Sequence, residues 1–577
     1  MRSSFTLLLL VAACASNPGA ATAPAQVSAA PPREHSFRPV VTIVVDQMAA
    51  WIAEERWPLL PADGGFARLR REGTFVTSMR YAHAVTDTAP GHSALYTGAV
   101  PRASGICINE VPDGKGGLAS ILRDERTELV GAGGVLPGQA GSSLAVLQVE
   151  TVADRLRAAH PDAFIVSLSL KDRGALFGGG RRPTASLWLD VKSAQMVTST
   201  AFAEKLPAWA VPLGSAEALE QRRTLVWRPL DPRWVEAHAA TGDAQDGEGD
   251  AAGLGITFPH SLAGTAPYGR ALRTSPSGDD LLLDLALASL DAERPRAGTR
   301  PTLLAISLSP NDYIGHTFGP DSWEAWDELA RLDASLARFF AGLDARFGKD
   351  GYDVLLSADH GVTTMPEATT TPAARPWCAH PDKPDRWGRP CGPAARVLPA
   401  ALTRELREVA RGALGSGDWV AEVNDPYVFL TPAARALPPA QVTALKDALA
   451  SSLRAHAEIA EVFDVPALPS PCPPEQDESI GALVCRSTSK ASGDLYVVTR
   501  PGSFFDPNVV VGKGTSHGTP YLYDRTVPFV ARAPGQIPAG KVIDTPVAFE
   551  AFARTAATLL GIDPPAPARS AVDLATR

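Results

Sequence analysis

Four short runs of apolar residues recur along the chain, and polar residues follow each run directly. The runs lie in the segments PVVTIVVDQ, AFIVSLSLKDR, TLLAISLSPND and YDVLLSADHG, which start at residues 39, 163, 302 and 352. Continuous apolar runs are typical of strands that are buried on both faces of a parallel sheet. Helix-like stretches lie between them, and 323–343 is a clear one because apolar side chains recur there every three or four positions. The pattern predicts an α/β fold with a mostly parallel central sheet flanked by helices on both faces.

The polar residues that follow these runs are types that bind metal ions or anions. They are Asp46, Lys171, Arg173, Asp312, Asp359 and His360. In an open α/β sheet the ligand crevice lies beyond the carboxyl ends of the strands, so we expect these side chains at one edge of the sheet. A single polar residue after a strand is more often a turn former or a helix N-cap. That alternative does not account for the whole set.

Three carboxylates and three imidazoles make up a candidate ligand set. Its members are Asp46, Asp312, His316, Asp359, His360 and His517. This combination is the ligand chemistry of paired, zinc-like divalent ions. Asp312 and His316 are four residues apart, so one helical turn would place both on the same side. His517 lies in the glycine-rich segment GKGTSHGT, where the backbone can approach a site closely, although alone it would be a loop residue.

Thr88 stands directly before a Pro-Gly pair in the segment AVTDTAPGHSALYTG, at what we expect to be the first turn of a helix. Helix N-termini attract anions because their first N–H groups are unpaired. A neutral hydroxyl is a poor nucleophile, and a neighbouring dication would stabilise its alkoxide. A plain N-cap is the alternative for Thr88.

Length and charge exclude one class of partner and indicate an insertion. The chain has 577 residues and a formal charge of -9, and it lacks a Lys/Arg stripe, so we expect no nucleic-acid partner. A chain this long exceeds one ordinary domain. We place the first part of the catalytic core at 37–365, an α/β insert or cap at 366–496 and the second part of the core at 497–577. The insert is a lid beside the site or, alternatively, a structural embellishment.

The N-terminus reads as an export signal. Its apolar run at 5–13 is too short to span a bilayer and ends in VAAC at Cys14, which resembles a bacterial lipobox. We therefore expect a lipoprotein signal peptide at 1–14, lipidation of Cys14 and a flexible linker at 15–36. The protein would be periplasmic and attached to the outer membrane. Ordinary signal cleavage near residues 21–23 is the alternative.

Export permits disulfides, and four of the six cysteines lie in two close pairs. The natural short-range bridges are Cys378 to Cys391 and Cys472 to Cys485. Cys107 is left over, and we interpret it as a buried small apolar residue rather than a reactive thiol.

The motifs VVDQ, TAPGH, SPNDYIGH, SADHG and TSHGT, in this order, resemble the alkaline phosphatase superfamily. They resemble in particular the phosphate-irrepressible bacterial alkaline phosphatases, which use a threonine nucleophile. The resemblance implies two zinc ions per chain. One zinc would be held by Asp312, His316 and His517, and the other by Asp46, Asp359, His360 and the oxygen of Thr88.

The same resemblance assigns the substrate-binding residues. Asn109 falls where this group has an asparagine that donates to a phosphoryl oxygen, and Lys171 and Arg173 match its Lys-x-Arg pair. A dianionic monoester benefits from two cations and an amide donor, whereas a diester carries one charge less. The resemblance therefore implies a phosphate monoester hydrolase that acts through a phosphothreonine at Thr88. We expect it to act as a monomer on small-molecule phosphate monoesters.

Other functions share parts of this pattern. A nucleotide pyrophosphatase/phosphodiesterase of the same superfamily would share every metal ligand. A sulfatase would share the fold class, but its Cys/Ser-x-Pro-x-Arg pattern needs an arginine that TAPGH lacks. A non-catalytic lipoprotein that binds metal or phosphate remains the third alternative.

Overall fold

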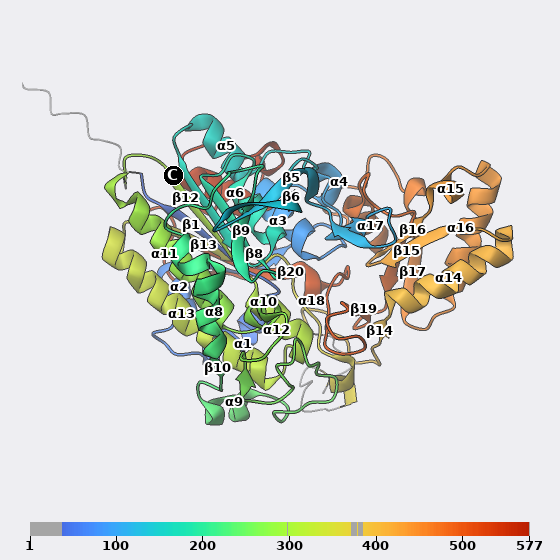
Figure 1. The fold of residues 1–577 in the computed structure, drawn as a ribbon, viewed down its shortest axis with the longest axis horizontal. Coiled ribbons are helices and arrows are strands. Elements are labelled where there is room, and N and C mark those ends of the chain that lie inside the picture. The colour runs from blue at the N-terminus through green and yellow to red at the C-terminus, as the bar shows by residue number, and fades with distance from the viewer. Residues whose placement is uncertain (1–36, 297, 371–377, 379–384, 576–577) are drawn as a thin grey trace, which may run out of the picture. The chain divides into compact units, whose positions relative to one another are not determined.

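The computed structural model describes residues 37–296, 298–370, 378 and 385–575, and residues 36–577 form one compact unit (Figure 1). The expected signal peptide, Cys14 and the linker at 15–36 lie outside the described residues. Within the described part of the chain, no helix has the length and apolar character needed to cross a membrane.

A large mixed sheet forms the centre of the molecule. Its five middle strands are parallel, in the order β13 (Asp353–Ser357), β1 (Val40–Val45), β12 (Thr302–Leu308), β7 (Phe164–Ser169) and β8 (Ala185–Asp190). The four predicted apolar runs are the first four of these strands, and every residue in them is buried. The predicted buried parallel strands are thus confirmed.

Strands joined mainly by antiparallel pairings extend this sheet on both sides. Beyond β13 lie β20 (Thr526–Arg532) and β2 (Thr74–Arg80), and β2 pairs with β21 (Lys541–Ile543) and β22 (Val547–Ala548). Beyond β8 lie β9 (Gln195–Ser199), β5 (Arg123–Gly131) and β6 (Gly134–Ser142). The sheet is therefore parallel in its middle and largely antiparallel toward its edges.

Helices pack on the sheet in two groups, one on each face (Figure 1). One group is α2 (Gly65–Glu72), α11 (Ser277–Glu293), α12 (Pro310–Phe318) and α13 (Trp323–Phe347); the other is α3 (Thr88–Thr97), α5 (Val152–Ala159), α6 (Asp172–Gly179) and α19 (Glu550–Leu559). The helix predicted at 323–343 is α13. Ser322 caps its N-terminus by accepting from Ala325 N, and Leu329, Leu336 and Phe339 are among the side chains it buries. Apolar burial along one stripe explains its length.

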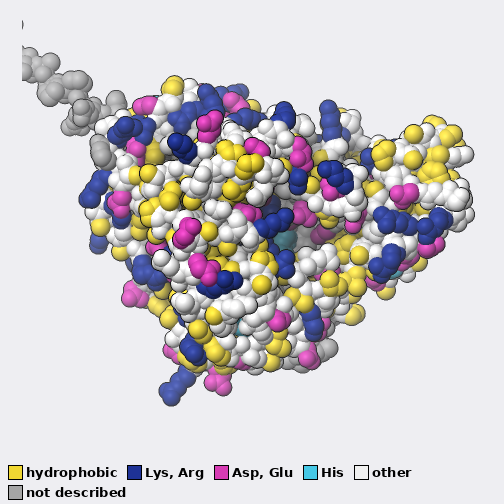
Figure 2. All heavy atoms as spheres, in the orientation of Figure 1, with side chains coloured by type: hydrophobic (Ala, Val, Ile, Leu, Met, Phe, Trp, Pro, Cys, Tyr) yellow, Lys and Arg dark blue, Asp and Glu magenta, His cyan; other side chains and the backbone are white. Residues whose placement is uncertain are grey.

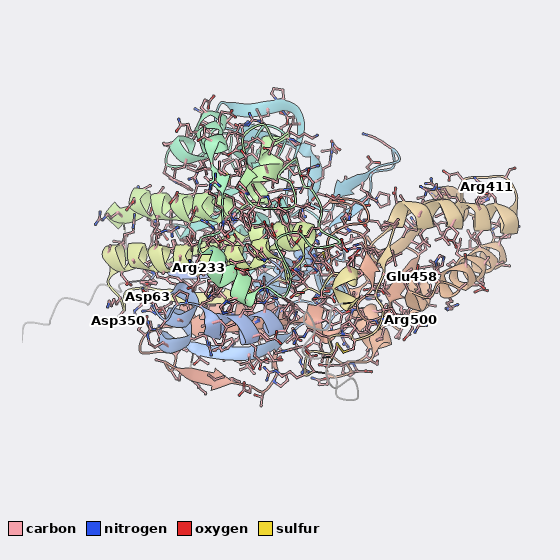
Figure 3. The ribbon with its side chains drawn as sticks, turned by 90° about the horizontal axis from the view of Figure 1, so that it is seen from below. Asp63, Arg233, Asp350, Arg411, Glu458 and Arg500 are labelled. Atoms are coloured by element: carbon pink, nitrogen blue, oxygen red, sulfur yellow. A yellow bond between two sulfur atoms is a disulfide. The ribbon has the colours of Figure 1, made fainter. Side chains whose placement is uncertain are left out.

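A second α/β layer lies in the sequence between β13 and β20. Its four-stranded antiparallel sheet has the order β15 (Val420–Asn424), β16 (Tyr427–Leu430), β18 (Leu495–Thr499) and β17 (Ile459–Asp464). It packs against α14 (Pro399–Leu414) and α16 (Pro439–Arg454) around an apolar core of its own. The boundary placed at residue 496 falls inside β18, so this sheet continues past it. Figure 3 shows Arg411 and Glu458 on this layer, away from Asp63 and Asp350 of the large sheet's helices and loops.

Both expected disulfides are present. Cys378 is bonded to Cys391, and Cys472 to Cys485. Cys107 is a free, buried thiol, and the pKa of that thiol is raised by burial. A neutral thiol in this position is consistent with a packing role.

Candidate active site and metal centre

Side chains from four neighbouring strands meet at one edge of the large sheet. Asp46 follows β1, Lys171 follows β7, Asp312 lies on the helix after β12, and Asp359 and His360 follow β13. The strands are parallel and adjacent, so their carboxyl ends share that edge. All five side chains are at most 4% exposed. The predicted convergence at the sheet edge is therefore present.

Two sets of ligand atoms lie close enough together to hold an ion. One set is Asp312, His316 and His517, and the other is Asp46, Asp312 and His360. Asp312 Oδ1 lies 3.1 Å from His316 Nε2 and 3.6 Å from His517 Nε2. His360 Nε2 lies 3.4 Å from Asp46 Oδ1 and 3.5 Å from Asp359 Oδ2. Asp312 thus stands between the two sets, and Asp359 adjoins the second.

The histidines present the same ring nitrogen to this cluster. His316 Nδ1 donates to Thr515 O at 2.8 Å and His517 Nδ1 donates to Thr86 O at 2.7 Å. His360 Nδ1 donates to the carbonyl of the next residue, Gly361, at 3.0 Å. A ring whose Nδ1 hydrogen is fixed on a carbonyl presents an unprotonated Nε2 when it is neutral. All three imidazoles are therefore oriented as metal ligands require.

Lys171 supplies the positive charge among the carboxylates. Its Nζ lies 2.6 Å from Asp46 Oδ2 and 2.6 Å from Asp312 Oδ2. Burial lowers the pKa of this amine, but the two carboxylates outweigh burial and raise the pKa above its usual value. Burial also raises the pKa of Asp46, and Asp312 and Asp359 raise it further. Like charges held this close favour an additional cation at the cluster.

Burial and neighbouring charges also shift the pKa values of Asp312, His360 and His517. Burial alone would raise the pKa of Asp312, but His316 and Lys171 hold it well below its usual range. Burial lowers the pKa of His360 to about 4. Burial acts in the same way on His517, but contact with Asp312 prevails and raises its pKa to about 9.

Thr88 is the first residue of α3, and its hydroxyl faces this cluster. Its Oγ1 accepts a hydrogen bond from Lys171 Nζ at 3.2 Å. The N-cap is Asp87, whose carboxylate accepts from Thr88 N at 2.9 Å. Because Asp87 fills the capping position, the hydroxyl of Thr88 is free of that role. The helix N-terminus, the hydroxyl and the candidate ligands thus lie at one place.

The expected substrate-binding residues line one pocket of about 460 Å³ with Thr88. Asn109 accepts from Ala89 N at 2.8 Å through Oδ1, and its Nδ2 donates to Asp87. Arg173 is at the N-terminus of α6, and its Nε is buried without a hydrogen bond to any described group. The opposite wall comes from the second layer and the loop after it, including Asn424 and Asp425. Figure 2 shows a hollow in which histidine, acidic, and Lys or Arg side chains meet.

Comparison with known proteins agrees with this geometry. The model of the type I phosphodiesterase / nucleotide pyrophosphatase family matches residues 40–518. The chain belongs to this family. The family lies within the alkaline phosphatase superfamily, so the expected resemblance is confirmed.

Several relatives of this family are named alkaline phosphatases. PhoV of Synechococcus elongatus is 34% identical over 332 residues, which are 57% of this chain and 59% of PhoV. PhoK of Sphingomonas sp. is 29% identical over 512 residues, which are 87% of this chain and 84% of PhoK. The crystal structure of wild-type alkaline phosphatase PafA is 26% identical, with a TM-score of 0.77, and covers 93% of this chain and 98% of PafA. The matched segment thus spans about three fifths of the length of PhoV.

Two further side chains contact the candidate site residues, and the sequence did not single them out. Gln47 Nε2 donates to Asp312 Oδ1 at 2.8 Å. His92 Nδ1 lies 3.0 Å from Asp359 Oδ2 and 3.0 Å from Thr88 O, while its Nε2 lies 2.9 Å from Ser307 Oγ. Both stand inside quoted motifs, VVDQ and TAPGH. Their position in the motifs was the available signal, but their partners are distant in sequence.

Proposed function

We propose that this protein is a metal-dependent phosphate monoester hydrolase, an alkaline phosphatase that acts through a phosphothreonine at Thr88 with two zinc ions. The observation that carries the proposal is the contact of Thr88 Oγ1 with Lys171, which in turn contacts two carboxylates of the ligand cluster. A hydroxyl at a helix N-terminus, beside ligand atoms, is placed as a phosphoryl-transfer nucleophile must be. The relatives named alkaline phosphatases support the same conclusion.

The residues present fit two zinc ions. Asp46 Oδ1 and His360 Nε2 are buried and make no hydrogen bond to any described group, which leaves their lone pairs free for a cation. The first zinc would be held by Asp312, His316 and His517, and the second by Asp46, Asp359, His360 and Thr88 Oγ1. When bound, zinc lowers the pKa of a coordinated oxygen and stabilises charge on phosphoryl and leaving-group oxygens.

The chain's own groups bind and orient the phosphoryl group. The second N–H of the Asn109 amide and the guanidinium of Arg173 are donors in the pocket beside Thr88, whereas the first N–H groups of α3 already donate to Asp87 and Asn109. The Thr88 Oγ1–P bond forms as the P–O bond to the organic group breaks, and the departing alcohol takes up a proton. Water then breaks the Thr88 Oγ1–P bond and releases phosphate. Positioning and charge supply most of the catalysis of phosphoryl transfer.

Hydrolysis of phosphate diesters is the second candidate, and the family description favours it. Two cations, Lys171 and Arg173, together with Asn109, line the pocket. This donor set matches the dianion of a monoester better than the single charge of a diester. We therefore place monoesters first.

The test compares 4-nitrophenyl phosphate with bis(4-nitrophenyl) phosphate, using the purified, zinc-loaded chain and its Thr88→Ala variant. We expect the monoester to be the better substrate in kcat/KM. Thr88→Ala should lose about 10³-fold or more of this activity while it retains its zinc, because only the nucleophile is removed. A variant that still hydrolyses the monoester at the wild-type rate contradicts the role of Thr88. Faster cleavage of the diester favours the second candidate.

We also propose that the protein is exported, lipidated at Cys14 and monomeric. The two disulfides support an oxidising compartment. Mass spectrometry of the mature N-terminus tests the lipid, since ordinary cleavage near residues 21–23 would remove Cys14. Light scattering of the detergent-free Cys14→Ser variant tests the monomer.

A further inference from the structure

Arg273 lies on the wall of the candidate active-site pocket and has no acidic partner among the residues that the structure describes. It ends α10 (Tyr268–Arg273), and it is one of the side chains that line the pocket. Among the described residues its guanidinium forms no ion pair, although the acidic residues Asp87, Glu110, Asp312, Asp425 and Asp506 line the same pocket. Its Nε is buried and hydrogen-bonds to no described group. A half-buried guanidinium without an anion carries an uncompensated desolvation cost.

Tyr313 holds this arginine in place. The Arg273 Cζ lies 4.1 Å from the centre of the Tyr313 ring, and Nη1 donates to Tyr313 Oη at 3.2 Å. A guanidinium that is stacked and hydrogen-bonded loses little further freedom when it binds an anion. The fork of N–H donors is therefore fixed before any ligand arrives.

The Tyr313 ring lies beside both Arg273 and the ligand cluster. Lys171 Nζ lies 4.8 Å from the centre of the Tyr313 ring, and Lys171 also contacts Thr88 Oγ1. Tyr313 is the neighbour of Asp312 on α12. One aromatic ring thus lies beside both the cation at the ligand cluster and the unpaired cation farther along the pocket wall.

We propose that Arg273 and Tyr313 form a second anion subsite, which binds a phosphate or carboxylate group on the organic part of the substrate. The inference rests on the proposed function and names its substrate class, phosphate monoesters that carry a second anionic group. The planar guanidinium matches both oxyanions in a two-pronged arrangement. The pocket of about 460 Å³ leaves room for a short chain between the two anions.

The test uses the zinc-loaded full-length chain and three matched substrates. Propyl phosphate has one anion, 1,3-propanediol bisphosphate adds a phosphate, and 4-phosphooxybutanoate adds a carboxylate. We expect kcat/KM for the doubly anionic substrates to exceed that for propyl phosphate about tenfold, mainly because KM is lower. The bisphosphate has two equivalent ends, so its value is first divided by two. Bisphosphates of longer diols then give the chain length that best spans the two sites.

Variants separate the subsite from a structural role. Arg273→Met should lose the tenfold preference while kcat/KM for propyl phosphate stays within about twofold, and Arg273→Lys should keep part of the preference. Arg233→Met, an exposed arginine on α9 (Pro232–His238), is the matched control and should keep the full preference (Figure 3). If Arg273→Met lowers kcat/KM for all three substrates equally, Arg273 only supports Tyr313 and the proposal is overturned.

A binding experiment keeps the two proposals distinguishable. Calorimetry with the Thr88→Ala chain should show the bisphosphate binding about tenfold more tightly than propyl phosphate, with the difference lost when Arg273→Met is added. Equal affinities overturn the subsite, whether or not the wild-type chain is a hydrolase. Absence of hydrolysis by the wild-type chain, with the affinity difference intact, overturns the proposed function and leaves the subsite supported.

Discussion

Two of the groups of buried carboxylates in the described part of the chain are compensated in different ways. The site cluster consists of Asp46, Asp312 and Asp359 with Lys171 and three histidines. The acid pair consists of Asp279 on α11 and Glu328 on α13, both at most 2% exposed. Each acid shifts the pKa of the other, and no described group donates a hydrogen bond to either carboxyl. The acid pair has no lysine or imidazole partner among the described residues.

The pKa values differ accordingly. Burial raises the pKa of Asp279 well above its usual value and that of Glu328 to about 7. In the site cluster, burial pushes Asp359 in the same direction, but His360 and His92 hold its pKa below the usual value. Burial therefore favours the protonated form of the acid pair, whereas counter-charge keeps the site cluster ionised. Burial of an acid alone does not indicate a metal site.

The largest contrast should come from neutralising one acid in each group. Asp359→Asn should lower kcat/KM for 4-nitrophenyl phosphate about 10³-fold and remove bound zinc, because one of the proposed zinc ligands is lost. Asp279→Asn should leave both within about threefold, since burial already favours the neutral form of this carboxyl. Activity and zinc content measured on the same samples check both. A large activity loss in Asp279→Asn would show that the two groups are functionally linked.

The next largest effect should come from removing Lys171, the positive charge of the site cluster. Lys171→Met should cost about 3–5 kcal/mol of unfolding free energy in the chelated protein, because buried carboxylates lose their cation. Zinc should restore part of this loss, since it supplies positive charge at the same atoms. Denaturant unfolding with chelator and with zinc checks this. The control is Lys446→Met, whose partner Asp464 lies 2.7 Å away in a partly exposed pair and which should cost under about 1 kcal/mol.

The acid pair should make the free energy of unfolding depend on pH. The folded-state pKa of Glu328, about 7, lies above its unfolded value, so the folded state is favoured when the proton is bound. This contribution to stability is present in full below about pH 4 and is lost as pH rises to about 7. Glu328→Gln keeps a neutral side chain, so its stability relative to wild type should rise by about 2–3 kcal/mol between pH 5 and pH 8. A difference that does not change with pH contradicts the raised pKa of Glu328.

The smallest effect should come from the hydrogen bonds around the site cluster. Gln47→Met removes the donor to Asp312 with little change in volume, and we expect zinc affinity to fall about tenfold. Zinc competition against a chromophoric chelator measures this. Gln441→Met, at an exposed position of α16, is the control and should bind zinc as the wild type does. Unchanged affinity in Gln47→Met would show that Asp312 needs no orienting donor.

Local patterns predicted the elements well, and the reason is that each signal is contained in a few neighbouring residues. The apolar runs marked four buried strands because burial on both faces leaves no polar alternation. The helical period marked α13, and the spacing of Asp312 and His316 placed both on one turn of α12. The two disulfides joined cysteines only 13 residues apart. The end of the second layer was missed, because a strand pattern at β18 does not say which sheet it joins.

The sequence by itself thus determined the strands, the main helices, the types of ligand side chain and their place after strands. Only the tertiary structure decided the strand order β13-β1-β12-β7, which sets Asp312 between the two ligand sets and brings Gln47 to it across 265 residues. It also decided that Arg273 packs on the Tyr313 ring without an ion pair to any described carboxylate. The physical reason is that periodicity and capping are local, whereas pairing between distant strands and the charge around a buried group depend on the whole packed chain.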